Sequence, residues 1–407
     1  MEFKIYTMAE IHAVSIFELR EFAKEIGVRA PTMFTKEQLE NAVYEKLQQI
    51  DKQRKAPVEL LSPRSRVGII NKSLIPEEER GEFGPFKKLS DDLELKKFEG
   101  FFRPFENGDG LISRRLVPTD DDMFISQNFV EGVKLVIGDR VCGEYVDGKD
   151  DRPASVARVT AVNGKKIDEH RAADILYSEK RKPYKSLKLW SEDFSLRSLS
   201  LSGALMYGSR VLLTHGTDCA LTELNLCLAD ALEDMGMRVL PLFLGVLPEY
   251  VRTIDERGAT ACAFDIEERY ARKAVELLVE AACRAAEEGE DVAVIVDNLE
   301  AIADSDTVRK MIGCACALDK GSITVFASAN EEIMDMRSLR TAESVSDMLV
   351  RFVSRRGKNC VDFRHCLCKR SDADWILLDR LSEIEGEAVD AIVRNCPTRE
   401  DAERLLK

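Results

Sequence analysis

The sequence predicts a multidomain chain in which an α+β half is followed by an α/β half. Helical spacing of apolar residues runs through 14–50, short strand-like segments fill 96–165, and buried strands alternate with helices from about 190 onward. A chain of 407 residues is long enough for two or three domains. The changes of pattern divide the chain into 1–50, 51–95, 96–165 and 166–407.

The first segment is predicted to be a helix–loop–helix module. Apolar residues recur at helical spacing up to Gly27, which ends the first helix. Thr35 and Gln38 have the spacing of a capping box, in which each side chain bonds the other residue's backbone N–H. Residues 51–95 are charged and contain several prolines, so they are predicted to be a linker with a short ordered patch near "VGIINKSLI".

Segments 96–165 and 166–407 are both predicted to contain strands, but turns connect the strands in the first segment and helices connect them in the second. In 96–165, pieces such as "DDMFISQNFV" and "KLVIGDRVCGEYV" are separated by turns such as "NGDG" and "VDGKDD". About five short strands indicate a small β-barrel, for which an OB-fold is one option among several. In 166–407, "SRVLLTH", "MRVLPLFLG", "DVAVIVDN" and "GSITVFAS" alternate with helices, which predicts a parallel sheet.

Composition and charge limit the classes of partner. Hydrophobic residues make up 45% and charged residues 32%, as in an ordinary globular protein. No apolar run is long enough to span a bilayer, and the N-terminus lacks a secretory signal pattern, so we expect a cytoplasmic protein with no membrane partner. The net charge of −14 opposes non-specific coating of nucleic acid, although a local basic patch remains compatible with RNA binding.

The eleven cysteines predict reduced, buried thiols, because most lie in apolar or helical surroundings. Two C-x-C pairs are present, Cys314 with Cys316 and Cys366 with Cys368. One-residue spacing suits alternation along a strand as well as it suits metal ligation. A zinc site usually has a C-x2-C pair and a second matching pair, which this sequence lacks, so no metal is predicted.

A colinear series of local strings resembles the bacterial transcription termination factor Rho. The strings are "FELREFAKEIGV…TKEQL", "PTDDDMFISQNFVEGVKLVIGDRVCGEY", "SEDFSLRSLSLSGALMYGSRVLL", "LFLGVLPEYV", "ACAFDIEE", "EDVAVIVDNLEAIA" and "KGSITVFASA". The resemblance covers most of the chain and implies an N-terminal Rho-like helical module, an OB-like barrel of the RNA-binding type and a C-terminal RecA-like P-loop domain. A Rho-type motor is a hexameric, RNA-dependent ATPase.

The segment "VLLTHGTDCALTELNLCLADAL" stands where the resemblance places the P-loop. The family pattern is approximately "PPKAGKTxLL". Leu221 occupies the position of its Lys, Ala220 that of the Gly before the Lys, and Thr222 that of the Mg²⁺-holding Thr. Loss of the Lys removes a charge-assisted bond to phosphate, and Asp218 adds a negative charge beside it. We therefore expect no cofactor, with ATP and Mg²⁺ binding lost or weak.

The catalytic segment of the family is also altered. Where Rho has "DERPEEV", this chain has "GVLPEYV", so Gly245, Val246 and Leu247 replace Asp, Glu and Arg. Asp297 in "VIVDN" matches the Walker-B Asp and is interpreted either as a ligand or as an ordinary strand-end Asp. Thr222 and Asp297 are thus the candidates for a relic nucleotide pocket, and no catalytic residue is predicted.

The parts that move RNA in the family are reduced as well. About two dozen residues separate Asp297 from Gly321, too few for the family's RNA-gripping loop and a helix, and "MDMRSLRTAESVSD" lacks the Lys-Gly element of a later loop. Arg351 lies one place out of register with the arginine finger, and Arg355 and Arg356 follow it. This pattern indicates either a shifted finger or, more simply, a solvated basic strand end. Self-assembly is possible, but a monomer or dimer is expected rather than a homohexamer.

The primary RNA site implied by the resemblance has lost its aromatic residues. The family's "DGFGFLR" turn corresponds to "NGDGLIS", in which Asp109 and Leu111 replace both aromatics and Ser113 replaces the Arg. Arg152 matches an Arg that lines the base pocket, and Pro153 replaces the neighbouring Tyr.

Another aromatic cluster offers a second interpretation. Phe101, Phe102 and Phe105 alternate with Arg103, and they form either a stacking surface or part of a core. RNA binding is expected to be weak or altered. Its candidate residues are Arg103, Leu111, Arg114 and Arg152.

These patterns predict a catalytically silent Rho-like protein that acts by binding and modulates Rho-dependent termination through Rho, RNA polymerase or RNA. One alternative is a divergent but active RNA-dependent ATPase, which needs another cation in place of the lost Lys. Arg210 and Lys310 are the cations to consider, and the spacing supports neither. The other alternative is a structural or sensing protein no longer tied to transcription.

Overall fold

The structure is a computed structural model of the chain. The residues that it describes are 11, 14–25, 28, 34–54, 58–60, 69–71, 95–148, 153–167, 185–189, 191–203, 205–264, 268–302, 304–355, 357–368, 372–384, 386–396 and 398–406.

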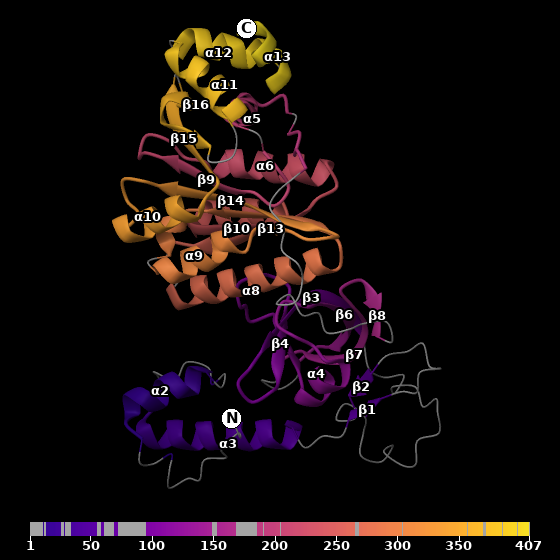
Figure 1. Cartoon of the computed structure of the whole chain (residues 1–407). Helices are drawn as coiled ribbons and strands as arrows, with labels where there is room; N and C mark the ends of the chain where they lie inside the picture. The colour runs from indigo at the N-terminus through magenta and orange to yellow at the C-terminus, as the bar shows by residue number, and fades with distance from the viewer. Residues whose placement is uncertain are drawn as a thin grey trace. The chain divides into compact units, whose positions relative to one another are not determined.

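The chain forms two compact units. The first comprises Met1–Arg114, Asp120–Val136 and Arg140–Ala172, and the second comprises Arg115–Thr119, Ile137–Asp139 and Ala173–Lys407. The first contains the N-terminal helices and a β-barrel, and the second contains the large sheet and the C-terminal helices (Figure 1).

The first unit begins with the predicted pair of helices, α2 (Ile16–Glu25) and α3 (Lys36–Arg54). The capping box is present: the backbone N–H of Thr35 donates to Gln38 Oε1 at 3.0 Å, and that of Gln38 to Thr35 Oγ1 at 3.4 Å. The two apolar stripes meet in a small core that includes the buried side chains of Leu19, Leu39 and Val43. Helix α3 continues past residue 50, into the range expected to be a linker.

Five strands of the first unit close into a barrel. Their order is β7–β5–β4–β3–β6, and β6 pairs again with β7. The bounds are β3 Lys96–Pro104, β4 Gly110–Ser113, β5 Met123–Ile125, β6 Arg140–Val146 and β7 Ser155–Val162, with helix α4 (Gln127–Val133) between β5 and β6. The β5–β7 pair is parallel, while the other barrel pairs are antiparallel. This closed five-stranded barrel is compatible with an OB-like domain.

Three shorter strands extend the barrel sheet. β1 (Val58–Leu60) pairs with β2 (Ile69–Asn71), β2 pairs with β7, and β8 (Lys165–Lys166) also pairs with β7. β2 lies within the string "VGIINKSLI". The range expected to be a linker therefore contains two strands of this sheet, and β2 lies in the string where a short ordered patch was predicted, because its β-branched residues suit a strand.

The barrel core is built from alternate residues of its strands. Phe98 and Phe102 of β3 point inward and pack with Ile112, Met123 and Phe129. Phe102 is therefore a core residue, not part of a stacking surface, whereas Phe105 after the strand end is 40% exposed.

The second unit contains a sheet with the order β11–β10–β12–β14–β9–β15–β16. The first six strands in that order are mutually parallel, and β16 is antiparallel to β15. The bounds are β9 Arg210–His215, β10 Arg238–Val246, β11 Thr260–Ala263, β12 Asp291–Asp297, β14 Ser322–Asn330, β15 Met348–Arg355 and β16 Lys358–Val361. Short antiparallel strands β13 (Cys316–Ala317) and β17 (Leu367–Cys368) pair with β14 and β15. This arrangement is compatible with a RecA-like domain.

Helices cover both faces of this sheet. Helix α6 (Thr222–Asp234) lies on one face, and α8 (Glu268–Glu287), α9 (Ser305–Gly313) and α10 (Met336–Val345) lie on the other (Figure 1). β14 is buried along its whole length, as expected for a central strand covered on both faces. The remaining helix of this region, α7 (Pro248–Glu256), joins β10 to β11.

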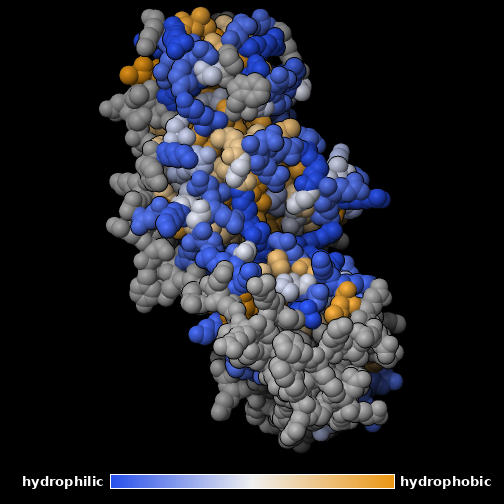
Figure 2. Space-filling view, turned by 90° about the vertical axis from the view of Figure 1, so that its right-hand side faces the viewer, coloured by the Kyte–Doolittle hydropathy of each residue, from blue (hydrophilic) through white to orange (hydrophobic). Residues whose placement is uncertain are grey.

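Beyond β15 and β16, three helices end the chain: α11 (Asp372–Glu383), α12 (Gly386–Asn395) and α13 (Arg399–Leu405). Their buried residues, among them Leu378 and Val393, join the same apolar cluster as Leu196 and Leu199 of α5 (Phe194–Leu201). In Figure 2, hydrophilic residues cover most of the described surface, with smaller apolar patches between them. None of the helices in the described part of the chain has the length and apolar character to cross a membrane.

Gly143 in β6 provides a test of the barrel packing. A Cβ at this position would lie 2.0 Å from the carbonyl oxygen of Arg158 and 2.9 Å from the Phe98 ring. Since neither neighbour can move freely, Gly143→Ala is expected to lower the free energy of unfolding by at least about 2 kcal/mol. The measurement is calorimetric unfolding of the purified variant.

Gly313→Ala is the matched control, because a Cβ there meets nothing within 4 Å. It is expected to be neutral or to stabilise by up to about 1 kcal/mol, as Ala does in a helix. Equal effects of the two substitutions would contradict the close strand contact at Gly143.

Candidate functional site

The candidate site lies at the carboxyl edge of the parallel sheet, where ligands bind in open α/β folds. β9 ends at His215, the loop 216–221 follows, and α6 begins at Thr222. β14 lies between β9 and β12, and β12 ends at Asp297. The topology therefore brings the predicted relic residues Thr222 and Asp297 to the same edge.

Asp297 is fully buried and is held by three neutral donors. The Thr222 hydroxyl donates to Oδ2 at 2.7 Å, and the Asn225 amide donates to Oδ1 at 2.8 Å. The Ser328 hydroxyl also donates to Oδ1. Asn225 lies one turn into α6 and Ser328 lies on β14, so one carboxylate joins three elements of the fold.

These hydrogen bonds give Asp297 a structural role within the second unit. A carboxylate that holds Mg²⁺ must offer an oxygen to the metal or to its water shell. Here Oδ1 accepts two hydrogen bonds and Oδ2 accepts one, so protein donors fill three of about four acceptor positions, and Thr222, the second expected Mg²⁺ contact, is one of the donors. Sequence analysis missed Asn225 and Ser328, because a small polar residue inside a helix or strand gives no local signal of its partner.

The loop after β9 is held from one side by Glu332, which follows β14. Its Oε2 accepts from the Thr217 hydroxyl at 2.7 Å and from the Thr217 backbone N–H at 3.3 Å. These bonds, with a smaller contribution from Arg351, lower the pKa of Glu332, so they are complete at neutral pH and are lost only as the pH falls through this lowered pKa. In a phosphate-binding loop, backbone N–H groups point to the ligand. Here an acidic side chain of the chain itself takes one of them.

Asn359 of β16 holds the same loop from the other side. Its amide donates to the Ala220 carbonyl at 2.6 Å, and its Oδ1 accepts from the Cys219 thiol at 3.1 Å. Burial, with a smaller contribution from Asp218, raises the pKa of Cys219 to about 12, so this thiol stays protonated and can donate. The loop is therefore bonded to two different elements of its own unit.

Leu221 does not project from the loop. It is 1% exposed and belongs to the same apolar cluster as Leu224 and Leu228 of α6. A Lys at this position in a P-loop reaches the β- and γ-phosphates. Leu221 instead contributes to the core that fixes α6 on the sheet.

The three residues that replace the family's catalytic segment lie at the end of β10 and at the start of α7. Gly245 has a φ of +62°, which favours glycine. Val246 is buried and its carbonyl accepts from Phe264 at 2.9 Å, while Leu247 is 51% exposed before α7. None of the three side chains is able to polarise a water molecule.

The surroundings of the loop are acidic. Asp218 and Glu332 are exposed, and Glu300, beside the end of β14, accepts from the Asn330 backbone N–H at 3.1 Å. Burial raises the pKa of Glu300 above its usual value. The carboxylates of Asp218 and Glu332 oppose a polyphosphate because like charges repel, although water screens them at this exposed position.

Arg351 and Arg355 both have partners within the chain. Arg351 forms an ion pair of 2.5 Å with Glu331. Arg355 pairs with Asp390 of α12 at 3.3 Å and also donates to the Gly386 and Val361 carbonyls. The two side chains are 32% and 29% exposed, so the basic end of β15 is partly solvated while its guanidinium groups are paired within the chain. Arg356 lies outside the described residues.

The barrel carries three of the four candidate RNA-binding residues. Arg103 of β3 is opposite Leu111 of β4, on the barrel face opposite to Phe102 and Ile112. Arg103 is 9% exposed and Leu111 is half-buried. Arg114 is exposed, with its guanidinium 5.4 Å from the centre of the Tyr145 ring. Arg152 lies outside the described residues.

An aromatic residue that sequence analysis missed adjoins this group. Phe124 of β5 is opposite Leu111 and is half-buried, so Arg103, Leu111 and Phe124 are consecutive cross-strand neighbours. Strand alternation within "DDMFISQ" was the available signal, because Met123 and Ile125 both point into the core. Asp109, in contrast, is fully buried and accepts from the Gln127 backbone N–H at 2.8 Å, so it organises the turn and the start of α4.

The cysteines are all free thiols. Cys316 lies on β13 and Cys368 on β17, and both are buried. Within the described ranges, no group of three or more His, Cys, Asp or Glu side chains has the arrangement needed to hold a metal ion.

No family model matches the sequence, and no curated protein does. Solved structures give weak similarities. One is the ATP synthase subunit NeqB from Nanoarcheaum equitans, with a TM-score of 0.45, 12% identity, and coverage of 58% of this chain and 69% of that one. Another is an ATPase from the type III secretion system of pathogenic bacteria, with a TM-score of 0.42, 10% identity, and coverage of 64% and 86%.

The bond between Thr222 and Asp297 predicts a measurable contribution to stability. Thr222→Val keeps the shape of the side chain but removes one donor to a buried carboxylate. The free energy of unfolding is expected to fall by about 1–2 kcal/mol, the usual cost of leaving such a group less satisfied. Urea unfolding followed by circular dichroism measures it.

Thr341→Val is the control. The Thr341 hydroxyl donates, in an exposed hydrogen bond, to a carbonyl of its own helix, that of Arg337, at 2.8 Å. Its loss is expected to change stability by less than about 0.5 kcal/mol. If Thr222→Val lowered the free energy of unfolding by no more than Thr341→Val, the hydrogen bonds of Asp297 would not contribute measurably to stability.

Proposed function

We propose that this chain is a nucleotide-independent binding protein built on an ATPase-type fold. The observation that supports the proposal is that the residues expected to bind a nucleotide are bonded to the chain's own side chains. Asp297 is bonded by Thr222, Asn225 and Ser328, and the loop 216–221 is bonded by Glu332 and Asn359. ATP would have to displace these bonds and would gain no Lys in return.

The energetic argument concerns both binding and catalysis. Binding of a polyphosphate needs cations or free N–H donors, and the buried Leu221 and the carboxylate of Glu332 provide neither. Hydrolysis needs an oriented water molecule, for which Gly245, Val246 and Leu247 offer no base. The two deficiencies are independent of each other. Together they favour a changed role over an ATPase with one tolerated substitution.

We further propose that the protein is a Rho-like factor that modulates transcription termination by binding Rho, RNA polymerase or RNA. The order of the Rho-like strings in the sequence supports the kinship, and the two kinds of domain occur in the corresponding order. The barrel face formed by Arg103, Leu111 and Phe124 supports weak or altered RNA binding, because the half-buried ring of Phe124 offers one stacking partner while Arg103 is only 9% exposed. The ion pair of Arg351 with Glu331 supports a state smaller than a homohexamer, since this Arg is already engaged.

The first test is ATP-analogue binding and RNA-stimulated hydrolysis by the purified chain, beside a Rho protein as a positive control. Neither binding nor turnover is expected. Leu221→Lys is expected to leave both absent, because Glu332 and the Asp297 network still occupy the pocket. Clear RNA-dependent hydrolysis by the wild-type chain would instead establish the divergent ATPase.

The second test concerns transcription. Addition of the chain to a termination assay with purified Rho and RNA polymerase is expected to change the fraction of terminated transcripts. If the effect runs through RNA, Phe124→Ala reduces it, since loss of one stacked base costs about 1–3 kcal/mol. If it runs through Rho or polymerase, the variant keeps it and the chain co-elutes with one of them. An unchanged fraction with no co-elution would favour a structural or sensing protein.

A further inference from the structure

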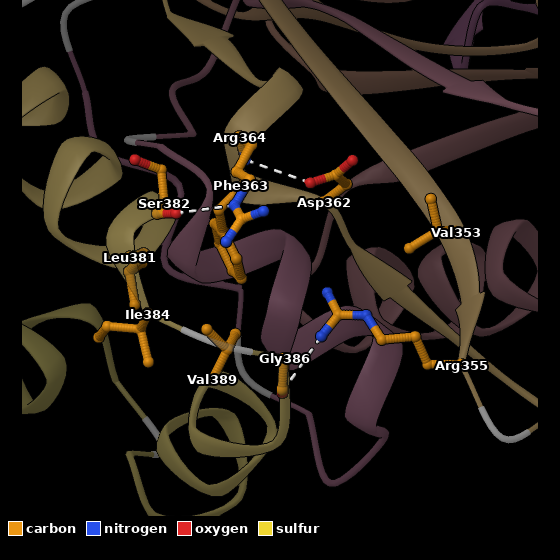
Figure 3. Close-up of a pocket in the computed structure, with 10 residues that line it drawn as sticks. All are labelled: Val353, Arg355, Asp362, Phe363, Arg364, Leu381, Ser382, Ile384, Gly386 and Val389. Atoms are coloured by element: carbon orange, nitrogen blue, oxygen red, sulfur yellow. Dashed lines mark hydrogen bonds between the residues drawn. The ribbon is translucent and has the colours of Figure 1, made fainter.

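A cavity of about 530 Å³ lies in the second unit, away from the loop 216–221 and Asp297. One side of it is formed by the end of β15 and by the short 3-10 helix η6 (Phe363–His365), and the other side by α11 and α12 (Figure 3). Its volume is in the range of small-molecule sites, which are about 300–1,000 Å³. The relic nucleotide pocket uses none of its lining residues.

One wall of the cavity is apolar. Leu381 of α11, Val389 of α12 and Phe363 of η6 are buried and line it, and Ile384 lies between the two helices. Figure 3 shows Leu381, Ile384 and Val389 together on one side of the space. Leu381, Val389 and Phe363 are at most 5% exposed, so a hydrocarbon chain would contact mainly Ile384 and the edges of the other three side chains.

Two guanidinium groups face the same space from the other side. Figure 3 shows Arg364 entering from η6 and Arg355 from the end of β15. The Nε–H of Arg364 donates to the Ser382 carbonyl at 3.0 Å. This bond orients the guanidinium group, whose two terminal nitrogens form a fork. Within the described part of the chain, no carboxylate is paired with the Arg364 side chain, so its two terminal nitrogens are available to an anion.

The guanidinium group of Arg355 is already hydrogen-bonded within the chain. Nη1 donates to the Gly386 carbonyl and to Asp390, and Nη2 donates to the Val361 carbonyl. Asp362 is hydrogen-bonded within the chain as well: it accepts from the Arg364 backbone N–H at 3.3 Å and lies 2.7 Å from His365 Nδ1. Arg355 therefore shapes the cavity, and Arg364 supplies its free positive charge.

We propose that this cavity binds a small amphipathic monocarboxylate. The carboxylate binds the fork of Arg364 in the bidentate geometry that guanidinium groups favour, and the hydrocarbon tail lies on Leu381, Ile384 and Val389. A polyphosphate does not fit this chemistry, because one free guanidinium stands near the carboxylates of Asp362 and Asp390. The proposal is independent of whether the chain binds nucleotide.

Octanoate is the probe, and octanamide is its neutral analogue of equal length. Titration of the full chain is followed by the methyl NMR signals of Leu381, Ile384 and Val389, and by calorimetry. Saturable shifts of these methyl groups are expected with octanoate, together with at least about tenfold weaker binding of octanamide. Absence of saturable shifts would overturn the site, and equal affinities would overturn its selectivity for an anion.

Arg364→Gln is expected to weaken octanoate binding about tenfold and to leave octanamide binding unchanged. Arg364→Lys is expected to fall between this variant and the wild type, because it keeps the charge and loses the fork. Arg309→Gln, an exposed position on α9, is the matched control and keeps wild-type affinity. Circular dichroism establishes that each variant is folded. Equal affinity of wild type and Arg364→Gln for octanoate would contradict the assignment of Arg364.

Discussion

The second unit depends on the burial of one carboxylate, that of Asp297. A buried charge destabilises a protein unless hydrogen bonds replace its hydration. The replacement comes from a hydroxyl and an amide of α6 and a hydroxyl of β14, so the end of β12 fixes the start of the helix above it and the strand beside it. The path of the loop 216–221 follows from these contacts, because its two ends are β9, which pairs with β14, and α6.

Much of the architecture could be predicted from local sequence pattern. The helix pair was predicted from apolar spacing, and its capping box formed as expected, because both effects act within a few residues. The alternation of strands and helices predicted the parallel sheet, because each element is recognised from the pattern within its own few residues. The range 51–95 was less informative: its charge and prolines hid two short strands, which depend on pairing with β7.

The candidate site was only partly predictable, because its bonds join residues far apart in the sequence. The replaced P-loop and catalytic residues could be identified one by one, and Thr222 and Asp297 do lie together. Nothing local indicated that Glu332 and Asn359 would bond the loop from opposite sides, since each lies more than a hundred residues from it. The same limit applies to Phe124, whose neighbour Leu111 is defined by strand register and not by sequence distance.

The bonds of Asn359 have a consequence for how the protein responds to its surroundings. A phosphate-binding loop that needs its ligand for order changes shape as nucleotide levels rise and fall. Here the Cys219 thiol and the Ala220 carbonyl are bonded to Asn359 of β16, a strand of the same sheet. In the proposed role, these bonds and not a nucleotide fix the path of the loop. A partner that recognises the loop therefore meets the same surface at any nucleotide concentration.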